Sequence, residues 1–134
     1  MSRSLFKISE QRNFGKLGLS RYINHVARFI HPSLKDVPLA SVLHALSDPT
    51  RLAIVRRLDE DRKGDADGLA CNCAAPDELP RATMSSHFTV LRGAGLIESR
   101  KQGTMVINRL RRDEIDARFP GLLDAVLEAE AAPA

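Results

Sequence analysis

The sequence predicts a mainly α-helical protein with one small β-hairpin, and three observations support this prediction. Apolar residues recur at intervals of three and four along much of the chain, which is the period of amphipathic helices. Two short β-like runs, 96–99 and 105–108, enclose the polar, basic turn Arg100-Lys101-Gln102-Gly103. The 134 residues are 43% hydrophobic but include no Trp and one Tyr, so we expect a single, mostly aliphatic core.

The N-terminal half is expected to hold three helices. Residues 1–16 are polar and predict a loose arm, whereas 17–131 predict one domain. Apolar spacing indicates helices at 17–30, 37–47 and 49–58, and His31-Pro32 ends the first of them. Asp48 is suited to cap the third helix and Pro49 to begin it.

The C-terminal half is expected to alternate helices with the hairpin. Residues 59–68 are charged and contain glycine, which predicts a loop. The other expected elements are a strand or turn at 69–73, one helical turn at 76–79, and helices at 81–94, 112–118 and 121–130. A polar helix followed directly by a basic hairpin is typical of a winged helix-turn-helix.

The helix at 81–94 has two contrasting faces. Met84, Phe88 and Leu91 form an apolar stripe, because residues advance about 100° per position around a helix. The opposite face is small and rich in hydroxyl groups; it comprises Ala82, Thr83, Ser85, Ser86, Thr89 and Gly93. Such a face can enter a DNA major groove, and its hydroxyls can bond base edges or phosphates. His87 beside the stripe is interpreted as a packed, hydrogen-bonded side chain.

Basic residues gather around this helix and the hairpin. Seven lie between 80 and 112, where Glu98 is the one acid: Arg81, Arg92, Arg100, Lys101, Arg109, Arg111 and Arg112. A cationic surface of this kind attracts a polyanion. We therefore predict DNA contacts by Arg81, Thr83, Ser85, Ser86, Thr89, Arg92, Arg100, Lys101 and Gln102.

Two segments of the sequence are similar to a known family. HALSDPTRLAIVRRL at 44–58 and RATMSSHFTVLRGAGLIESRKQGTMVINRL at 81–110 resemble the ArsR/SmtB transcriptional repressors, over about residues 38–112. The resemblance implies a homodimer that binds a palindromic operator and releases it when an effector binds. The family's dimer interface uses the first and last helices. Those helices supply Ile23, Val26, Ile30, Leu122, Leu123, Val126 and Leu127 here.

Cys71 and Cys73 are the candidate effector site. They resemble the Cys-x-Cys pair of arsenic-sensing family members, and thiolates suit arsenite, antimonite or zinc. No third cysteine exists, and the prolines nearby place the pair in a strand or loop rather than in a helix. Structural cysteines and a thiol redox switch remain alternatives. His25 and His31 are interpreted as structural or surface residues.

Other classes of protein are disfavoured by what the sequence lacks. No apolar run approaches the roughly 20 residues that span a bilayer, and the N-terminus lacks the features of a secretory signal, so we expect a cytoplasmic protein. An enzyme would depend on Cys71 with His87, because no phosphate loop or carboxylate pair is present. A regulator without a metal effector and a winged-helix protein-interaction module remain as alternatives.

Overall fold

The computed structural model describes residues 29–64 and 67–131, and its elements follow the predicted order. The helices and strands are η1 Leu34–Asp36, α2 Leu39–Ala45, α3 Pro49–Lys63, β1 Leu69–Ala70, α4 Cys71–Ala74, α5 Arg81–Gly93, β2 Ile97–Gln102, β3 Met105–Leu110, α6 Arg112–Arg118 and α7 Leu122–Ala131. None of these helices is long and apolar enough to cross a membrane. The mainly helical fold with a small hairpin is therefore confirmed.

The three strands form one antiparallel sheet in the order β1-β3-β2. The hairpin pairs Ile97 with Leu110 at its base and Gln102 with Met105 at its tip. Its two-residue turn contains Gly103 at φ 65°, a backbone conformation that two-residue hairpin loops require and that glycine adopts without strain. The predicted wing is thus present, and each of its strands is longer than expected.

The core is aliphatic around one aromatic ring. Phe88 of α5 is almost fully buried, and Ile54 and Leu58 of α3 are buried in the same cluster. This single cluster runs from Leu34 to Leu123 and so joins the first and last described elements. The composition of the sequence predicted a core of this kind.

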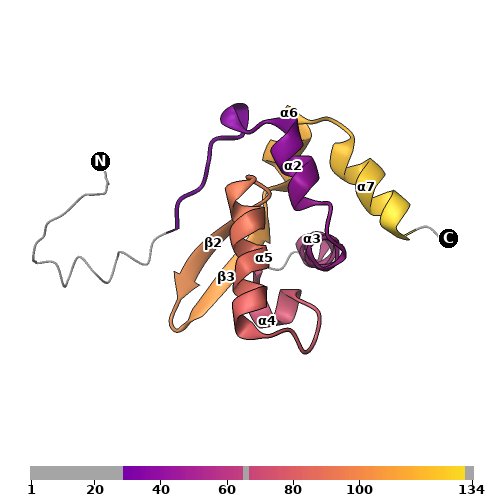
Figure 1. The fold of residues 1–134 in the computed structure, drawn as a ribbon. Helices are drawn as coiled ribbons and strands as arrows, with labels where there is room; N and C mark the ends of the chain where they lie inside the picture. The colour runs from indigo at the N-terminus through magenta and orange to yellow at the C-terminus, as the bar shows by residue number, and fades with distance from the viewer. Residues whose placement is uncertain (1–28, 65–66, 132–134) are drawn as a thin grey trace, which may run out of the picture.

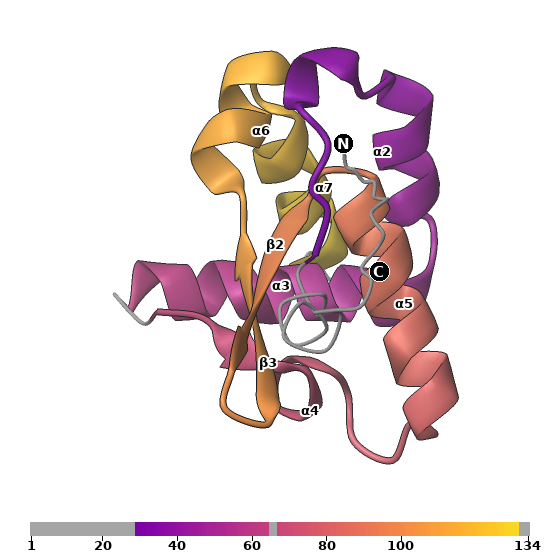
Figure 2. The same ribbon diagram turned by 90° about the vertical axis from the view of Figure 1, so that its left-hand side faces the viewer.

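The helices and the hairpin are arranged so that the molecule has two unlike ends. The hairpin tip, α4 and the N-terminal part of α5 lie at one end, whereas α6 and α7 lie at the other (Figures 1 and 2). Between the ends, α3 crosses the molecule and contacts β3, α5 and α7. The polar helix and the wing are therefore presented side by side.

The end of α3 differs from the prediction, whereas its start does not. α3 begins as expected, with the Asp48 carboxylate accepting a bond from the Arg51 backbone N–H at 3.0 Å. It continues to Lys63, however, so the predicted loop from 59 was wrong at its start. Asp59 stabilises this last turn by pairing with Arg62 and Lys63 at 3.1 and 3.4 Å.

The segment between α3 and α5 also differs from the prediction. β1 has two residues, and the helical turn lies at Cys71–Ala74 rather than at 76–79. Residues 77 and 78 form a turn in which Glu78 has φ 68°. The expectation that the two cysteines occupy a strand or loop was therefore wrong, because they lie on α4.

The elements near the two ends of the described residues agree with the prediction only in part. α6 has the predicted bounds, and α7 is shifted by one residue after Gly121, which has φ 80°. The second helix is shorter than predicted and is preceded by η1, where Arg118 of α6 donates to the Leu34 carbonyl at 3.2 Å. Residues 17–28 of the predicted first helix lie outside the described residues, and Phe29 and Ile30 are not helical.

Candidate nucleic-acid interface

The two faces of α5 are separated as the sequence predicted. Phe88 and Leu91 are buried, and Met84 packs partly buried against the same core. The opposite face is exposed over its whole length: Ala82, Thr83, Ser85, Ser86, Thr89 and Gly93. This face is flat and carries no long side chain, so a groove wall can approach the helix backbone closely.

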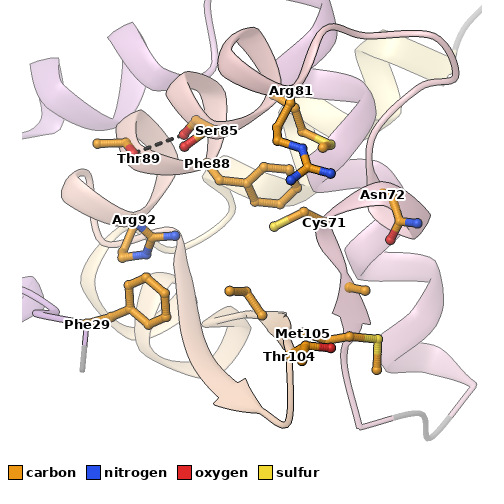
Figure 3. Close-up of a pocket in the computed structure, with 13 residues that line it drawn as sticks. Phe29, Cys71, Asn72, Arg81, Ser85, Phe88, Thr89, Arg92, Thr104 and Met105 are labelled. Carbon is orange, nitrogen blue, oxygen red and sulfur yellow. Dashed lines mark hydrogen bonds between the residues drawn. The ribbon is translucent and has the colours of Figure 1, made fainter. Parts of the chain in front are cut away.

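One hydroxyl of this face is already engaged within the helix. The Thr89 Oγ1 donates to the Ser85 carbonyl at 2.9 Å, so its proton is committed to the backbone while its oxygen can still accept (Figure 3). Thr83, Ser85 and Ser86 lie in the half of α5 nearer the hairpin tip. The hydroxyls best placed to donate to a ligand are therefore in the N-terminal half of α5.

The predicted turn at 100–103 was wrong, because Arg100, Lys101 and Gln102 are the last residues of β2. This end of the hairpin is cationic, but less so than the sequence suggested. Arg100, Lys101 and Gln102 are all exposed, as predicted. The Arg100 guanidinium, however, donates to the Asp67 carboxylate at 2.8 Å. The local charge pattern of 80–112 did not predict this pair, because Asp67 lies 33 residues before Arg100 in the sequence. Arg109 is held in the same way, 2.7 Å from Glu98 and 3.7 Å from Asp67.

Two of the seven basic residues do not contribute to this surface at all. The Arg111 side chain is buried and donates to the Pro32 carbonyl and to Glu114, each at 2.9 Å. Arg112 is buried among three carboxylates from three helices: Asp59 of α3, Asp116 of α6 and Asp124 of α7. The count of seven surface cations was therefore wrong, because acids distant in sequence fold back onto these two.

Arg81 and Arg92 occupy different positions on α5. Arg81 is the exposed first residue of the helix, where a phosphate can reach it. Arg92 is half-buried; its Nε donates to the Ser99 hydroxyl at 2.9 Å, and its guanidinium lies 4.3 Å from the centre of the Phe29 ring. Burial lowers the pKa of Arg92 below its ordinary value. An anion must enter the space between α5 and the wing to meet Arg92.

His87 is packed, as predicted, and it connects α5 to the rest of the helical core. Its side chain is 15% exposed, and its Nδ1 lies 3.3 Å from the Arg51 guanidinium and 3.9 Å from the Asp48 carboxylate. Since arginine only donates, Nδ1 is the acceptor. Arg51 also donates to the Ala45 and His44 carbonyls at the end of α2. The sequence did not predict this link between α2 and α5.

A buried polar network lies beneath the wing. The Ser99 hydroxyl donates to the side-chain Oδ1 of Asn108 at 2.7 Å, and the side-chain Nδ2 of Asn108 donates to the Leu69 backbone carbonyl at 3.2 Å. The His31 Nε2 accepts from the Ser99 backbone N–H at 2.9 Å, which confirms the structural interpretation of His31. Burial and the charge of Arg111 lower the pKa of His31, so the ring stays a neutral acceptor. His25 lies outside the described residues.

The two cysteines point to different environments. Cys71 is half-buried, and its Sγ accepts from the Asn108 amide at 3.3 Å, whereas Cys73 is exposed. Residues two apart in a helix are separated by about 200° around its axis, so the two thiols diverge. Among residues 29–64 and 67–131, no group of three His, Cys, Asp or Glu side chains is arranged to hold a metal ion. The two thiols therefore leave α4 in different directions, and the role of the pair as an effector site stays a prediction.

The predicted dimer residues fall into three groups. Leu123 is fully buried in the core of its own chain, so its assignment to a dimer interface was wrong. Leu122, Val126 and Leu127 pack partly buried against that core. Ile30 is 86% exposed, and Ile23 and Val26 lie outside the described residues.

A hollow of about 610 Å³ lies between α5, α4 and the wing. Arg81, Phe88 and Cys71 border one part of it, and Arg92 and Phe29 border the other (Figure 3). The wing contributes Thr104 and Met105 from its tip. The candidate interface is therefore concave where the recognition helix meets the hairpin.

Comparisons with known proteins agree with this geometry. A helix-turn-helix domain family model matches residues 46–100. An uncharacterised HTH-type transcriptional regulator of Methanocaldococcus jannaschii is 40% identical over 67 residues, which cover 48% of this chain and 68% of that protein. The HTH-type regulator YceK of Bacillus subtilis is 36% identical over 91 residues, which cover 65% of this chain and 84% of that protein.

A solved structure of an ArsR family transcriptional regulator has a similar fold. It aligns with a TM-score of 0.51 at 23% identity, covering 71% of this chain and 93% of that one. At this identity the likeness concerns the fold, and it matches the winged helix that the sequence resemblance implied. Together with the two relatives, it leads to one conclusion: this chain is a DNA-binding transcriptional regulator that belongs to the HTH-type regulators and has the winged-helix fold of the ArsR family.

Proposed function

We propose that this regulator is a homodimeric repressor that inserts α5 into the major groove of an operator and lays its wing on the phosphate backbone. The observation that supports this most directly is the exposed, hydroxyl-rich face of α5 beside the cationic end of β2, both at the same end of the molecule (Figure 2). A groove about 12 Å wide admits a helix, and a helix without long side chains on one face can approach base edges closely.

The side chains divide into two roles in this proposal. Thr83, Ser85 and Ser86 read base edges, because their hydroxyls are exposed and lie in the half of α5 that projects furthest. Arg81, Arg100, Lys101 and Gln102 anchor the backbone. Thr89 contributes as an acceptor, and Arg92 reaches a phosphate that enters the hollow.

Salt dependence tests the electrostatic part of the proposal. Affinity for duplex DNA should fall by about 0.9 log unit per log unit of salt for each phosphate neutralised, because bound cations displace condensed counterions. Fluorescence anisotropy with a labelled duplex, measured from about 50 to 200 mM salt, gives the slope. An affinity that stays constant over this range would exclude the backbone contacts.

Paired variants test the division of roles. Ser86→Ala should weaken operator binding by about 1–3 kcal/mol relative to non-specific DNA if Ser86 reads a base. The double change Arg100→Ala and Lys101→Ala should weaken all sequences alike and flatten the salt slope. If both proteins lose affinity in the same pattern, the assignment of separate roles fails.

The dimer needs a test that leaves the monomer intact. Ile30 suits this purpose because it is 86% exposed, so Ile30→Asp removes no contact from the core of the chain. We expect this variant to become monomeric and to lose operator affinity, since a dimer holds two half-sites about one helical turn apart. Leu43→Asp, an exposed change on α2, is the matched control for sedimentation analysis. An Ile30→Asp protein that sediments as a dimer would remove Ile30 from the interface.

The positions of the two thiols indicate whether Cys71 and Cys73 can bind a metal effector together. The divergence of Cys71 and Cys73 favours an effector other than a metal chelated by the pair. Arsenite, antimonite or zinc should therefore change operator affinity equally in the wild type and in a Cys73→Ser variant. A response that Cys73→Ser abolishes would restore the chelating site.

We also propose that the protein acts in the cytoplasm and catalyses no reaction. The one pair that the sequence offered for catalysis was Cys71 with His87. His87 lies within reach of Arg51 and Asp48, whereas Cys71 accepts from Asn108, so the two are not paired.

A further inference from the structure

The hollow between α5, α4 and the wing has the dimensions of a small-molecule site. Its volume of about 610 Å³ lies within the range of about 300–1,000 Å³ that is typical of ligand pockets. Its walls come from segments far apart in sequence, α4 and α5 on one side and the hairpin tip on the other. A molecule bound there would touch both DNA-contacting elements.

Charge in the hollow is unbalanced. Arg92 is half-buried, and its Nε donates to the Ser99 hydroxyl. The two outer nitrogens of its guanidinium have no hydrogen-bond acceptor among residues 29–64 and 67–131. Within 29–64 and 67–131, no carboxylate lies at ion-pair distance from Arg92 or from Arg81. A cation held partly away from water without a counter-charge is costly, so an anion entering the hollow would be stabilised.

The rest of the lining is largely apolar. Phe88 is almost fully buried, and Met84 and Val106 are half-buried beside it. Cys71 adds a small polarisable group between α4 and the helix (Figure 3). This lining is suited to a ligand that has an apolar part and one anionic group. The apolar part would bury the apolar side chains away from water, and the anionic group would pair with a guanidinium.

We propose that this hollow is an effector site for a small organic carboxylate. The carboxylate is bound by Arg92, and the apolar body lies against Phe88 and Val106. The regulatory part of the proposal rests on the proposed DNA-binding mode, because a ligand between α5 and the wing occupies the space into which a backbone phosphate would enter. Binding of the ligand and of DNA is then mutually exclusive, which releases the operator.

Direct binding without DNA tests the site. We would titrate the full chain with 2-naphthoate in a calorimeter, with 2-naphthamide as the uncharged analogue of the same shape. The acid should bind and the amide should bind at least about tenfold more weakly, since a hydrogen bond to a charged group is lost. Equal binding of the two, or no binding of the acid at millimolar concentration, would overturn the proposal.

Substitutions inside and outside the hollow test where 2-naphthoate binds. Arg92→Gln should weaken 2-naphthoate by about tenfold or more, and Arg57→Gln, an exposed arginine of α3 outside the hollow, should leave it unchanged. Thr89→Asp, at an exposed position of α5 that lines the hollow three residues from Arg92, places a carboxylate in the hollow and should also weaken 2-naphthoate, so the test remains decisive if Arg92→Gln fails to fold. Binding of 2-naphthoate that is the same in the wild type, Arg92→Gln and Thr89→Asp would place the ligand elsewhere and refute the proposal.

Competition separates this inference from the proposed function. Saturating 2-naphthoate should weaken duplex binding at constant ionic strength, whereas 2-naphthamide should not. Duplex binding that is unaffected by bound 2-naphthoate would refute the effector role while the DNA-binding mode stands. If the chain binds no duplex even without 2-naphthoate, the proposed DNA-binding mode fails, and the calorimetry still decides whether the hollow is a carboxylate site.

Discussion

The hairpin tip and the cluster around Arg112 use the same residue type in opposite ways. At the tip, Arg100 and Lys101 are exposed, and the acid that pairs with Arg100, Asp67, is itself 79% exposed. At the other end of the molecule, Arg112 is buried and bonded to Asp59, Asp116 and Asp124. The first arginine is available to a ligand, whereas the second joins α3, α6 and α7.

The difference shows that burial, not residue type, decides what each arginine does. An exposed ion pair contributes little to the free energy of folding and breaks readily. Arg100 can therefore exchange Asp67 for a DNA phosphate. A buried pair is costly to break, because the partner that remains is left charged away from water. Three predictions, from the largest expected effect to the smallest, test this contrast.

Removing the buried arginine should have the largest effect. Arg112→Ala leaves Asp59 buried with only Arg62 and Lys63 as partners, so the free energy of unfolding should fall by about 3 kcal/mol. Chemical denaturation followed by circular dichroism measures this change. Arg57→Ala, an exposed position on the same helix as Asp59, is the control and should change stability by less than about 0.5 kcal/mol. Equal losses in the two variants would refute the contrast.

Acid should weaken the same cluster. Burial by itself raises the pKa of Asp59, but the hydrogen bond from Arg62 and the charge of Arg112 outweigh it, so the pKa is lowered overall. A carboxyl whose folded pKa is lowered contributes stability above its unfolded pKa of about 3.9 and loses it as pH falls through the folded value. Asp59→Asn should therefore be less stable than the wild type by about 2 kcal/mol at neutral pH, and the gap should narrow below about pH 4. A difference in the free energy of unfolding between the wild type and Asp59→Asn that stays constant down to about pH 2 would argue against ion pairing by Asp59.

Freeing the exposed arginine should have the smallest effect and the opposite sign. Asp67→Asn removes the carboxylate that neutralises Arg100 and Arg109, so duplex affinity should rise by about two- to fivefold at low salt. The gain should shrink as salt is added, because the pair is exposed and screened. Asp36→Asn, an exposed acid on η1, should leave the affinity unchanged. A loss of affinity in Asp67→Asn would mean that Asp67 positions the wing.

The hydrophobic faces illustrate the same limit of sequence reasoning. Apolar spacing located the stripe of α5 correctly, since Phe88 and Leu91 are buried. It also located an apolar face on α7, but it could not say what that face contacts. Leu123 proved to be buried in its own chain, because α7 packs onto the same core as α3. A periodic pattern identifies a buried face and leaves the partner undetermined.

The sequence by itself determined the elements whose signals are local. The helix at α5, the glycine after it, the hairpin and the Asp48-Pro49 start of α3 depend on residues within a few positions of one another. Only the tertiary structure decided which charges are free and which thiol faces the hollow. Arg112 meets an aspartate 53 residues away, and Arg100 meets one 33 residues away. No local pattern specifies such pairs, because burial and ion pairing arise only when distant segments pack together.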